Sequence, residues 1–293
     1  MTMNAVELAS RFRIAGALDF VEAGDGLVKA VMSRSGMTGE LALQGAQVTA
    51  WQPTGARPVI FVSSRAVLAP DKAIRGGIPV IFPWFGPHPT DPKAPQHGFV
   101  RTAPWQLDSA AETADGVTLE LSLAAEGFGL TYRAVFGDEL RLHLEVRNTS
   151  PHPAMFEEAL HSYFAVSDVE RISVSGLENR GFIDKTDNMR RCPAAGAPLR
   201  LTKETDRVYL DVPDRLAISD PGWNRRIVIE KSGGASTIVW NPWPEKAAAM
   251  SDLGADNWRG FVCVETGNVA DNRITLAAGA AHEMATRIRL DAQ

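Results

Sequence analysis

The chain is poor in the features that mark several large classes of protein. Only two of its 293 residues are cysteine, at positions 192 and 263, which excludes a framework of several disulfides. No apolar run approaches the ~20 residues that a membrane-spanning helix needs. The formal net charge is −5, whereas domains that bind nucleic acid are usually basic. These deficits predict a protein that neither spans a membrane nor binds nucleic acid.

The first residues also lack the pattern of an export signal. Arg11 and Arg13 interrupt a short helical pattern, and no apolar signal core follows them. Disulfides persist mainly in oxidising compartments, so a chain with two distant cysteines and no export signal is expected in the cytoplasm.

Short runs with a period of two residues are what the sequence has in abundance. In residues 139–147, Leu140, Leu142, Leu144 and Val146 alternate with charged or polar residues, which is typical of a sheet with one face in water. Similar runs occur at 117–123, 171–175, 226–230, 236–240, 261–265 and 286–290. Turn-forming residues separate many of these runs, and this spacing favours an antiparallel β-sandwich.

Helical patterns are few. Residues 5–13 predict one short helix, and residues 244–250 predict another that begins with proline. The sequence shows no internal repeat, no low-complexity tract and no linker. With 45% apolar residues it can build a large core. We therefore expect an all-β fold with a few short helices, formed by a single domain over residues 1–293.

Residues 75–101, RGGIPVIFPWFGPHPTDPKAPQHGFVR, form the most unusual segment. They are too apolar and aromatic for a mobile linker and too rich in glycine and proline for a regular helix or central strand. The segment is therefore expected to hold one irregular shape. Arg75, His97 and Arg101 bracket it, which is typical of a loop that lines a pocket for an anion or a polyol.

His161 lies in the run FEEALHSYFAV. Read as one strand, this run places Ala159, His161, Tyr163 and Ala165 on the same face as Glu157. Such a mixture of polar, small and aromatic residues suits a pocket wall. The segment alone equally fits a histidine with a purely structural hydrogen bond.

Glu265 ends the apolar run FVCVETGN, with Phe261, Cys263 and Glu265 on one face. A partly buried glutamate has a raised pKa and is a better base, but a turn-forming glutamate fits this position as well. Cys263 has no basic neighbour in the sequence, so a small buried residue is a better interpretation than a nucleophile.

Other candidate motifs are absent or weak. No CxxC or HExxH spacing marks a zinc site, and Gly76-Gly77 lacks the context of a nucleotide-binding loop. Adjacent Glu157 and Glu158 point to opposite faces of a strand, so they cannot act as a glycosidase pair. Trp240 and Trp243 could stack on a sugar ring or pack in the core. The remaining histidines are interpreted as solvated, loop or strand-edge residues: His88, His143, His152 and His282.

Seven segments taken together resemble a known family. They are RGGIPVIFPWFG, QHGFVRTAPW, ALHSYFAVSD, SGLEN with DKTD, TDRVYLD, VWNPWPEKA and FVCVETGNV. In this order they are similar to the glucose-6-phosphate 1-epimerases, or hexose-6-phosphate mutarotases, of the aldose 1-epimerase (galactose mutarotase-like) superfamily. The resemblance covers roughly residues 20–290.

The resemblance implies a large antiparallel β-sandwich of the galactose mutarotase-like type. It also implies cofactor-free interconversion of the α and β anomers of a hexose 6-phosphate, with a monomer as the default state. His161 and Glu265 match the catalytic pair of the family, while Arg75, His97, Arg101 and Asp206 match its substrate-contacting positions.

These residue types suit ring opening and closure. Glu265 would take the proton of the anomeric hydroxyl while His161 protonates the ring oxygen. Arg75 and Arg101 would hold the phosphate, and His97 would add a hydrogen bond to the sugar. Asp206 would bind sugar hydroxyls, or alternatively pair with a nearby arginine. An epimerase for neutral sugars, or a binding protein without catalysis, remain the alternatives.

Overall fold

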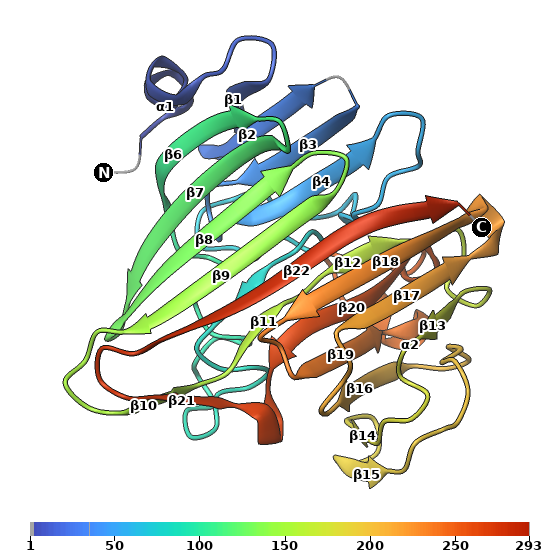
Figure 1. Ribbon diagram of the computed structural model, residues 1–293. Helices are drawn as coiled ribbons and strands as arrows, with labels where there is room; N and C mark the ends of the chain where they lie inside the picture. Colours follow the sequence, from blue (N-terminus) through green and yellow to red (C-terminus); the bar gives the residue numbers. More distant parts are fainter. Residues whose placement is uncertain (1–2, 35, 293) are drawn as a thin grey trace.

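The computed structural model describes residues 3–34 and 36–292, and two large antiparallel sheets dominate them (Figure 1). The larger continuous layer has the strand order β13-β17-β18-β22-β9-β8-β7-β6. Its strands are β6 Gln106–Thr113, β7 Gly116–Ala125, β8 Phe128–Phe136, β9 Leu140–Asn148, β13 Ser173–Ser175, β17 Arg215–Asp220, β18 Arg225–Ser232 and β22 Ala281–Ala292. We call this layer the long-strand sheet.

The second large sheet has the order β15-β14-β16-β19-β20-β11-β5, and β12 also pairs with β20. Its strands are β5 Val80–Ile81, β11 Glu158–Leu160, β12 Tyr163–Ala165, β14 Phe182–Asp184, β15 Arg190–Cys192, β16 Thr205–Tyr209, β19 Ser236–Asn241 and β20 Phe261–Asn268. We call this layer the short-strand sheet.

Smaller elements complete the described chain. One antiparallel sheet comprises β1 Leu18–Ala23, β2 Leu27–Arg34, β3 Met37–Ala42 and β4 Gln47–Pro53, and a two-stranded one comprises β10 Ala154–Phe156 and β21 Ile274–Leu276. The α-helices are α1 Ala5–Phe12 and α2 Trp243–Ala249, and the 3-10 turns are Pro221–Trp223, Asn257–Gly260 and Ala270–Asn272.

The predicted all-β fold is confirmed, because every run with period two overlaps a strand and both predicted helices form. Five of the seven runs lie wholly within a strand, whereas β13 begins two residues after the start of the run at 171–175 and β9 begins one residue after the start of the run at 139–147. Helix α1 begins where a capping box satisfies its free amide groups. Asn4 Oδ1 accepts from the Glu7 amide at 3.0 Å, and Glu7 Oε2 accepts from the Asn4 amide at 2.9 Å. Helix α2 begins near Pro244, as predicted. Among the described residues, no helix is long and apolar enough to cross a membrane.

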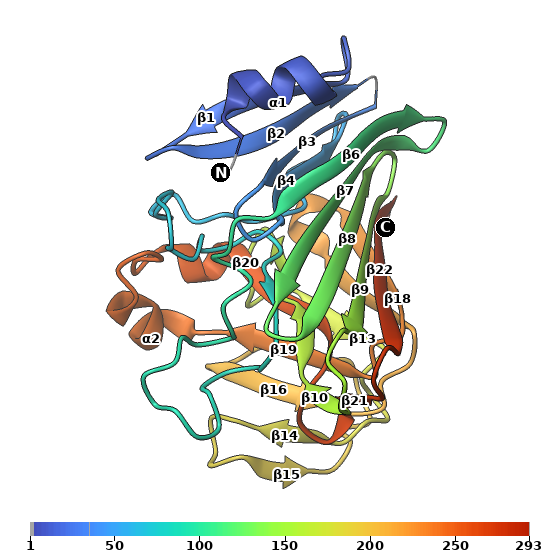
Figure 2. The same ribbon diagram turned by 90° about the vertical axis from the view of Figure 1, so that its left-hand side faces the viewer.

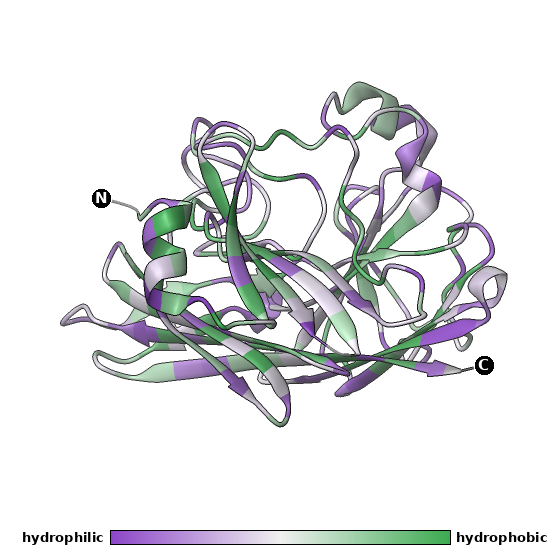
Figure 3. Cartoon of the chain, turned by 90° about the horizontal axis from the view of Figure 1, so that it is seen from above, coloured by the Kyte–Doolittle hydropathy of each residue, from purple (hydrophilic) through white to green (hydrophobic). Residues whose placement is uncertain are grey.

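The main hydrophobic core joins residues of both large sheets. Seen from above, the long strands form a layer in which hydrophobic and hydrophilic stretches alternate (Figure 3). Thr266 Oγ1 of β20 lies 3.4 Å from Thr286 Oγ1 of β22, so this face of β20 meets the long-strand sheet. Alternation along the strand turns Cys263 and Glu265 away from that sheet. Figure 2 shows the loops between β4 and β6, together with α2, on the side opposite the long strands.

Candidate active site

The register of the short-strand sheet places His161 beside Glu265. Leu160 pairs with Thr266 and Tyr163 pairs with Cys263, so His161 stands opposite Glu265 on the neighbouring strand. Side chains opposite each other in an antiparallel pair share a face. Residues 104 positions apart in the sequence therefore meet at one point of the sheet.

The expectation of one continuous strand through His161 is wrong. The chain forms β11 up to Leu160, leaves the ladder at His161 and Ser162, and resumes as β12 at Tyr163. The His161 amide donates instead to the carbonyl of Pro79 at 3.0 Å. This interruption does not change the predicted face, since the rings of His161 and Tyr163 stack with centroids 4.8 Å apart.

His161 and Glu265 form a buried pair. His161 Nδ1 and Glu265 Oε1 are 3.4 Å apart, and the two side chains are 9% and 1% exposed. Within the described chain, this nitrogen and both carboxyl oxygens have no hydrogen-bond partner. Glu265 is therefore more deeply buried than the sequence suggested, and it is not a turn-forming residue on the surface.

The surroundings of this pair disfavour charge on both members. Burial is the main cause that places the pKa of His161 well below 6.5, and the positive charges of Arg101 and Arg75 lower it further. Burial also raises the pKa of Glu265 well above 4.5, and the nearby Asp206 carboxylate raises it further. Both shifts favour the uncharged forms, in which the imidazole is neutral and the carboxyl group keeps its proton.

The segment 75–101 has the irregular course that its composition predicts, with β5 as a strand of two residues. Close backbone contacts explain two of its glycines. A Cβ on Gly77 would lie 2.4 Å from the Val48 carbonyl oxygen, and one on Gly98 would lie 1.8 Å from that of Phe82. Both glycines also have positive φ. The Gly77 contact therefore holds the segment against β4, and the Gly98 contact holds the segment against itself.

His97 enters the site from this loop. Its ring is inclined at 73° to that of His161, with centroids 5.5 Å apart. The Gly86 amide donates to His97 Nδ1 at 3.2 Å, so the neutral ring carries its proton on Nε2. Burial, together with the charges of Arg101 and Lys185, lowers the pKa of His97 to about 3. His97 is therefore a neutral hydrogen-bond donor throughout the physiological range.

Arg75 is held by two partners that the sequence did not suggest. Its Nη2 lies 3.0 Å from Asp252 Oδ2, and its Nη1 donates to the Tyr163 hydroxyl at 3.2 Å. Burial lowers the pKa of the Arg75 guanidinium, but Tyr163 and Asp252 raise it by more, and the net change is upward. The charge of Arg75 is thus permanent and partly neutralised.

Arg101 lies close to Arg75 but has different contacts. Its Nη2 donates to the Gln96 carbonyl at 2.7 Å, and it forms no ion pair within the described residues at the distances seen for Arg75 and Asp252. Burial lowers its pKa, while Tyr163 raises it. Arg101 is therefore the more available of the two guanidiniums for an anionic ligand.

Asp206 pairs with a lysine rather than with the arginine considered from the sequence. Lys185 Nζ lies 3.2 Å from Asp206 Oδ2 and 5.1 Å from the centre of the Phe85 ring. The charge of Lys185 acts on both His97 and Glu265. Sequence reasoning missed Lys185 and Asp252. Lys185 lies in the DKTD run that carries part of the resemblance, whereas no local pattern distinguishes Asp252.

The two tryptophans and the two adjacent glutamates singled out in the sequence have different surroundings in the structure. Trp240 lies beside His161, with ring centroids 6.2 Å apart, whereas Trp243 packs on Trp258. Glu157 and Glu158 do point to different partners: Glu157 Oε2 accepts from the Phe85 amide at 2.9 Å, and Glu158 Oε1 lies 3.2 Å from His282 Nε2. His282, interpreted from the sequence as a loop or strand-edge residue, lies at the start of β22 and has Glu158 as a partner.

The remaining histidines lie outside the site. His88 accepts from loop amides, and His143 faces Glu283 at 3.4 Å. His152 is exposed.

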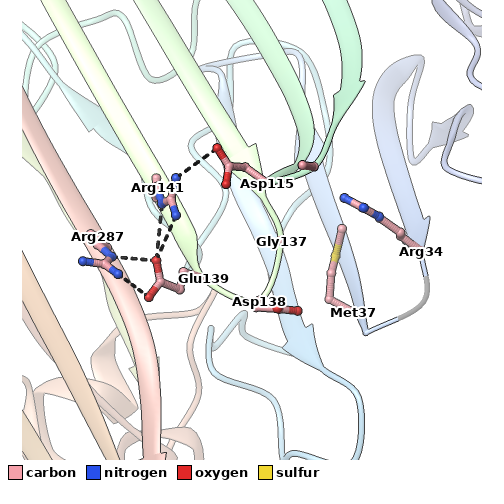
Figure 4. A pocket seen from close by; sticks show the side chains of 9 residues that line it. Arg34, Met37, Asp115, Gly137, Asp138, Glu139, Arg141 and Arg287 are labelled. Atoms are coloured by element: carbon pink, nitrogen blue, oxygen red, sulfur yellow. Dashed lines mark hydrogen bonds and ion pairs between the residues drawn. The ribbon is translucent and has the colours of Figure 1, made fainter.

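A surface depression of about 390 Å³ lies far from this centre, at one end of β8 and β9 (Figure 4). Its charges already neutralise one another, since Glu139 pairs with both Arg141 and Arg287 and Arg141 also reaches Asp115. Among the described residues, all three arginines that line it have carboxylate partners, so it lacks a free cation for an anionic ligand. Around His161 and Glu265, by contrast, two titratable side chains lie beside three cations and two carboxylates.

Comparison with known proteins agrees with this geometry. The family model described as aldose 1-epimerase matches residues 29–289. A protein of Escherichia coli (strain K12), provisionally named glucose-6-phosphate 1-epimerase, is 36% identical over 262 residues, which cover 85% of each chain. One from Cenchrus ciliaris with the same provisional name is 33% identical over 293 residues, covering 94% of this chain and 87% of its own.

A solved structure is similar over nearly the whole chain. The crystal structure of a provisionally assigned mutarotase from Salmonella typhimurium has a TM-score of 0.89 and 30% identity, and the match covers 96% of both chains.

Proposed function

The chain belongs to the aldose 1-epimerase family, and from this premise we propose that it interconverts the α and β anomers of a hexose 6-phosphate, with glucose 6-phosphate as the first candidate. The observation that carries the proposal is the buried pair of His161 and Glu265 beside a cluster of cations. The pair supplies the proton exchange, and the cations supply the attraction for a phosphate.

The reaction needs one proton that the Glu265 carboxyl group and the His161 imidazole can exchange. Moving that proton from Glu265 to His161, across 3.4 Å, gives a carboxylate base and an imidazolium acid. The carboxylate then removes the proton of the anomeric hydroxyl while the imidazolium protonates the ring oxygen, and the bond between C1 and that oxygen breaks. Rotation about C1–C2 exposes the other face of the aldehyde. The ring then closes with the proton transfers reversed.

A bound phosphate would favour this charged form. The positive charges of Arg101 and Arg75 are among the causes that lower the pKa of His161. A phosphate dianion paired with these guanidiniums removes part of that repulsion, so imidazolium formation becomes less costly when the substrate is in place. Burial of the pair strengthens the effect of the phosphate on the pKa of His161, because charges interact more strongly away from water.

The groups around the pair carry a net positive charge suited to a phosphate. Arg75, Arg101 and Lys185 face two carboxylates, which leaves one positive charge in excess. Arginine forks match phosphate oxygens. The Nε2–H of His97 is directed by its Gly86 contact to donate to the sugar. Asp206 remains available to accept a hydrogen bond from a sugar hydroxyl.

We also propose that the protein acts as a cytoplasmic monomer and as one structural unit. The support for one unit is that a single main hydrophobic cluster includes residues from Ala5 to Ile288. A core that extends over both large sheets disfavours independent domains.

Exchange NMR on anomers tests the activity. The rate of exchange between α and β forms is measured with glucose 6-phosphate and with glucose at matched enzyme concentrations. The proposal predicts strong acceleration for the phosphorylated sugar and much less for the free one. Equal acceleration would indicate an epimerase for neutral sugars, and binding of glucose 6-phosphate without acceleration would indicate a non-catalytic binding protein.

A further inference from the structure

Cys263 stands next to the proposed catalytic pair. His161, Cys263 and Glu265 each offer one ligand atom, and these atoms all lie within 4.8 Å of one another. Cys263 is two residues before Glu265 on β20 and is fully buried. The sequence, in which the cysteine and the histidine are 102 positions apart, contains no zinc-binding spacing. The cluster arises only from the pairing of β12 with β20.

The donor set indicates the class of cation. A thiolate, an imidazole nitrogen and a carboxylate oxygen suit zinc and its soft analogues, whereas magnesium and calcium prefer oxygen ligands. Zinc bound at ~2.3 Å from sulfur and ~2.0–2.2 Å from nitrogen and oxygen brings such atoms roughly 3.3–3.8 Å apart. The cluster must therefore contract by about 1 Å, which is a side-chain adjustment. Three protein ligands leave a fourth position for water or substrate.

A second feature of the cluster also points to a cation. His161 Nδ1 and both oxygens of Glu265 are buried and have no hydrogen-bond partner within the described chain. A buried polar atom without a partner costs about 1–3 kcal/mol, and coordination would satisfy at least two of these three atoms.

We propose that His161, Cys263 and Glu265 form a binding site for a zinc-class divalent cation, and that occupation of this site reversibly inhibits the enzyme. The ion takes Nδ1 of His161 and a carboxylate oxygen of Glu265, so the pair can no longer exchange protons with a sugar. Binding releases one proton from the thiol and one from the carboxyl group, which gives a neutral complex. The inhibition, but not the binding, rests on the proposed function.

The neighbouring cations weaken this site without abolishing it. Arg75 and Lys185 already pair with Asp252 and Asp206. Arg101 is left as the main source of repulsion. A ligand that neutralises these cations competes for the same space, and glucose 6-phosphate should therefore reduce metal uptake.

Cadmium titration tests the binding separately from activity. The probe is Cd²⁺, whose bond to a thiolate adds an ultraviolet charge-transfer band. The wild type and Cys192→Ala should show this band with one ion bound per chain, since Cys192 lies on β15 away from the cluster. Cys263→Ala and Cys263→Ser should lack it. A band that follows Cys192, or one that persists in both Cys263 variants while circular dichroism shows a normal fold, would overturn the proposal.

Zinc inhibition of anomer exchange tests the second part of the proposal, that the bound cation inhibits the enzyme. The inhibition constant should rise in Cys263→Ser by more than the ~10–100-fold typical of losing an outer-shell partner, and a chelator should restore activity. Equal inhibition of the wild type and Cys263→Ser would overturn the proposal. If cadmium binds at Cys263 but the protein accelerates no anomer exchange, the proposed function fails while the metal site stands.

Discussion

Replacing Arg101 by glutamine should selectively weaken the use of a phosphorylated sugar. The Arg101 guanidinium is partly exposed and acts electrostatically on His161 of the proposed pair. Its Nη2 donates only to the Gln96 carbonyl among the hydrogen bonds of the described chain. It is therefore the cation most available to a phosphate. Glutamine keeps an amide donor for Gln96 but removes the charge.

The magnitude follows from the bond that is lost. Hydrogen bonds to charged groups contribute about 1.5–3 kcal/mol, and each 1.36 kcal/mol is a factor of ten. We therefore expect kcat/KM for glucose 6-phosphate to fall about 10- to 150-fold, with little change for glucose. Initial rates of anomer exchange measured by NMR on both sugars give the ratio. Arg147→Gln, a change on the remote strand β9, is the matched control and should leave both rates unaltered.

Arg75 provides a second comparison within the same site. Its loss leaves the carboxylate of Asp252 unpaired beside the phosphate. Arg75→Gln alone should therefore reduce kcat/KM for glucose 6-phosphate more than Arg75→Gln combined with Asp252→Asn, because the double variant removes the uncompensated negative charge.

Equal losses for the free and phosphorylated sugars in Arg101→Gln would refute the prediction for Arg101, since Arg101 would then act on the fold or on the chemistry rather than on phosphate recognition.

Three further changes test titratable and hydrogen-bonding side chains outside the proposed pair. The pKa of His282 is raised, chiefly through its contact with Glu158. His282→Asn should therefore lose about 1–3 kcal/mol of stability below pH 6.5, and the loss should shrink as the pH rises through the pKa of the folded state. Urea unfolding at pH 6 and pH 9 measures this loss, and an equal loss at both pH values would contradict the prediction. Burial lowers the pKa of Lys231 to about 8 in the folded protein, against the ordinary value of 10.5. Between these pH values the unfolded chain binds more protons than the folded one, so the stability of the wild type should rise with pH, whereas that of Lys231→Met should not. Glu157→Gln should raise KM by ~5-fold, or about 1 kcal/mol, by loosening its hold on the Phe85 amide, and an unchanged KM would refute a role for this contact.

The strands were predictable because their signal is local. Alternation in residues 139–147 reflects one face in the core and one in water, and the structure confirms it in β9. The irregular loop was equally visible, because glycine and proline exclude regular elements at 75–101. The family resemblance then selected His161 and Glu265, for which the residues alone left structural interpretations open.

The partners of the site residues could not be read from the sequence. Asp252 lies 177 positions from Arg75, and nothing near it in the chain marks it as a partner. The contact of His282 with Glu158 likewise depends on β22 reaching the edge of β20 and β11. Such pairs arise from the three-dimensional course of the chain. The break in the strand at His161 has the same origin, because its amide bonds to Pro79 rather than continuing the ladder with β20.

The most direct test of the account is the rate of anomer exchange of glucose 6-phosphate catalysed by Glu265→Gln, measured by exchange NMR. The variant keeps the size and burial of the side chain but cannot accept the proton of the anomeric hydroxyl. With circular dichroism and thermal unfolding like those of the wild type, it should reduce the exchange rate to the spontaneous value. A rate close to that of the wild type would contradict the assignment of His161 and Glu265 as the proton-exchanging pair.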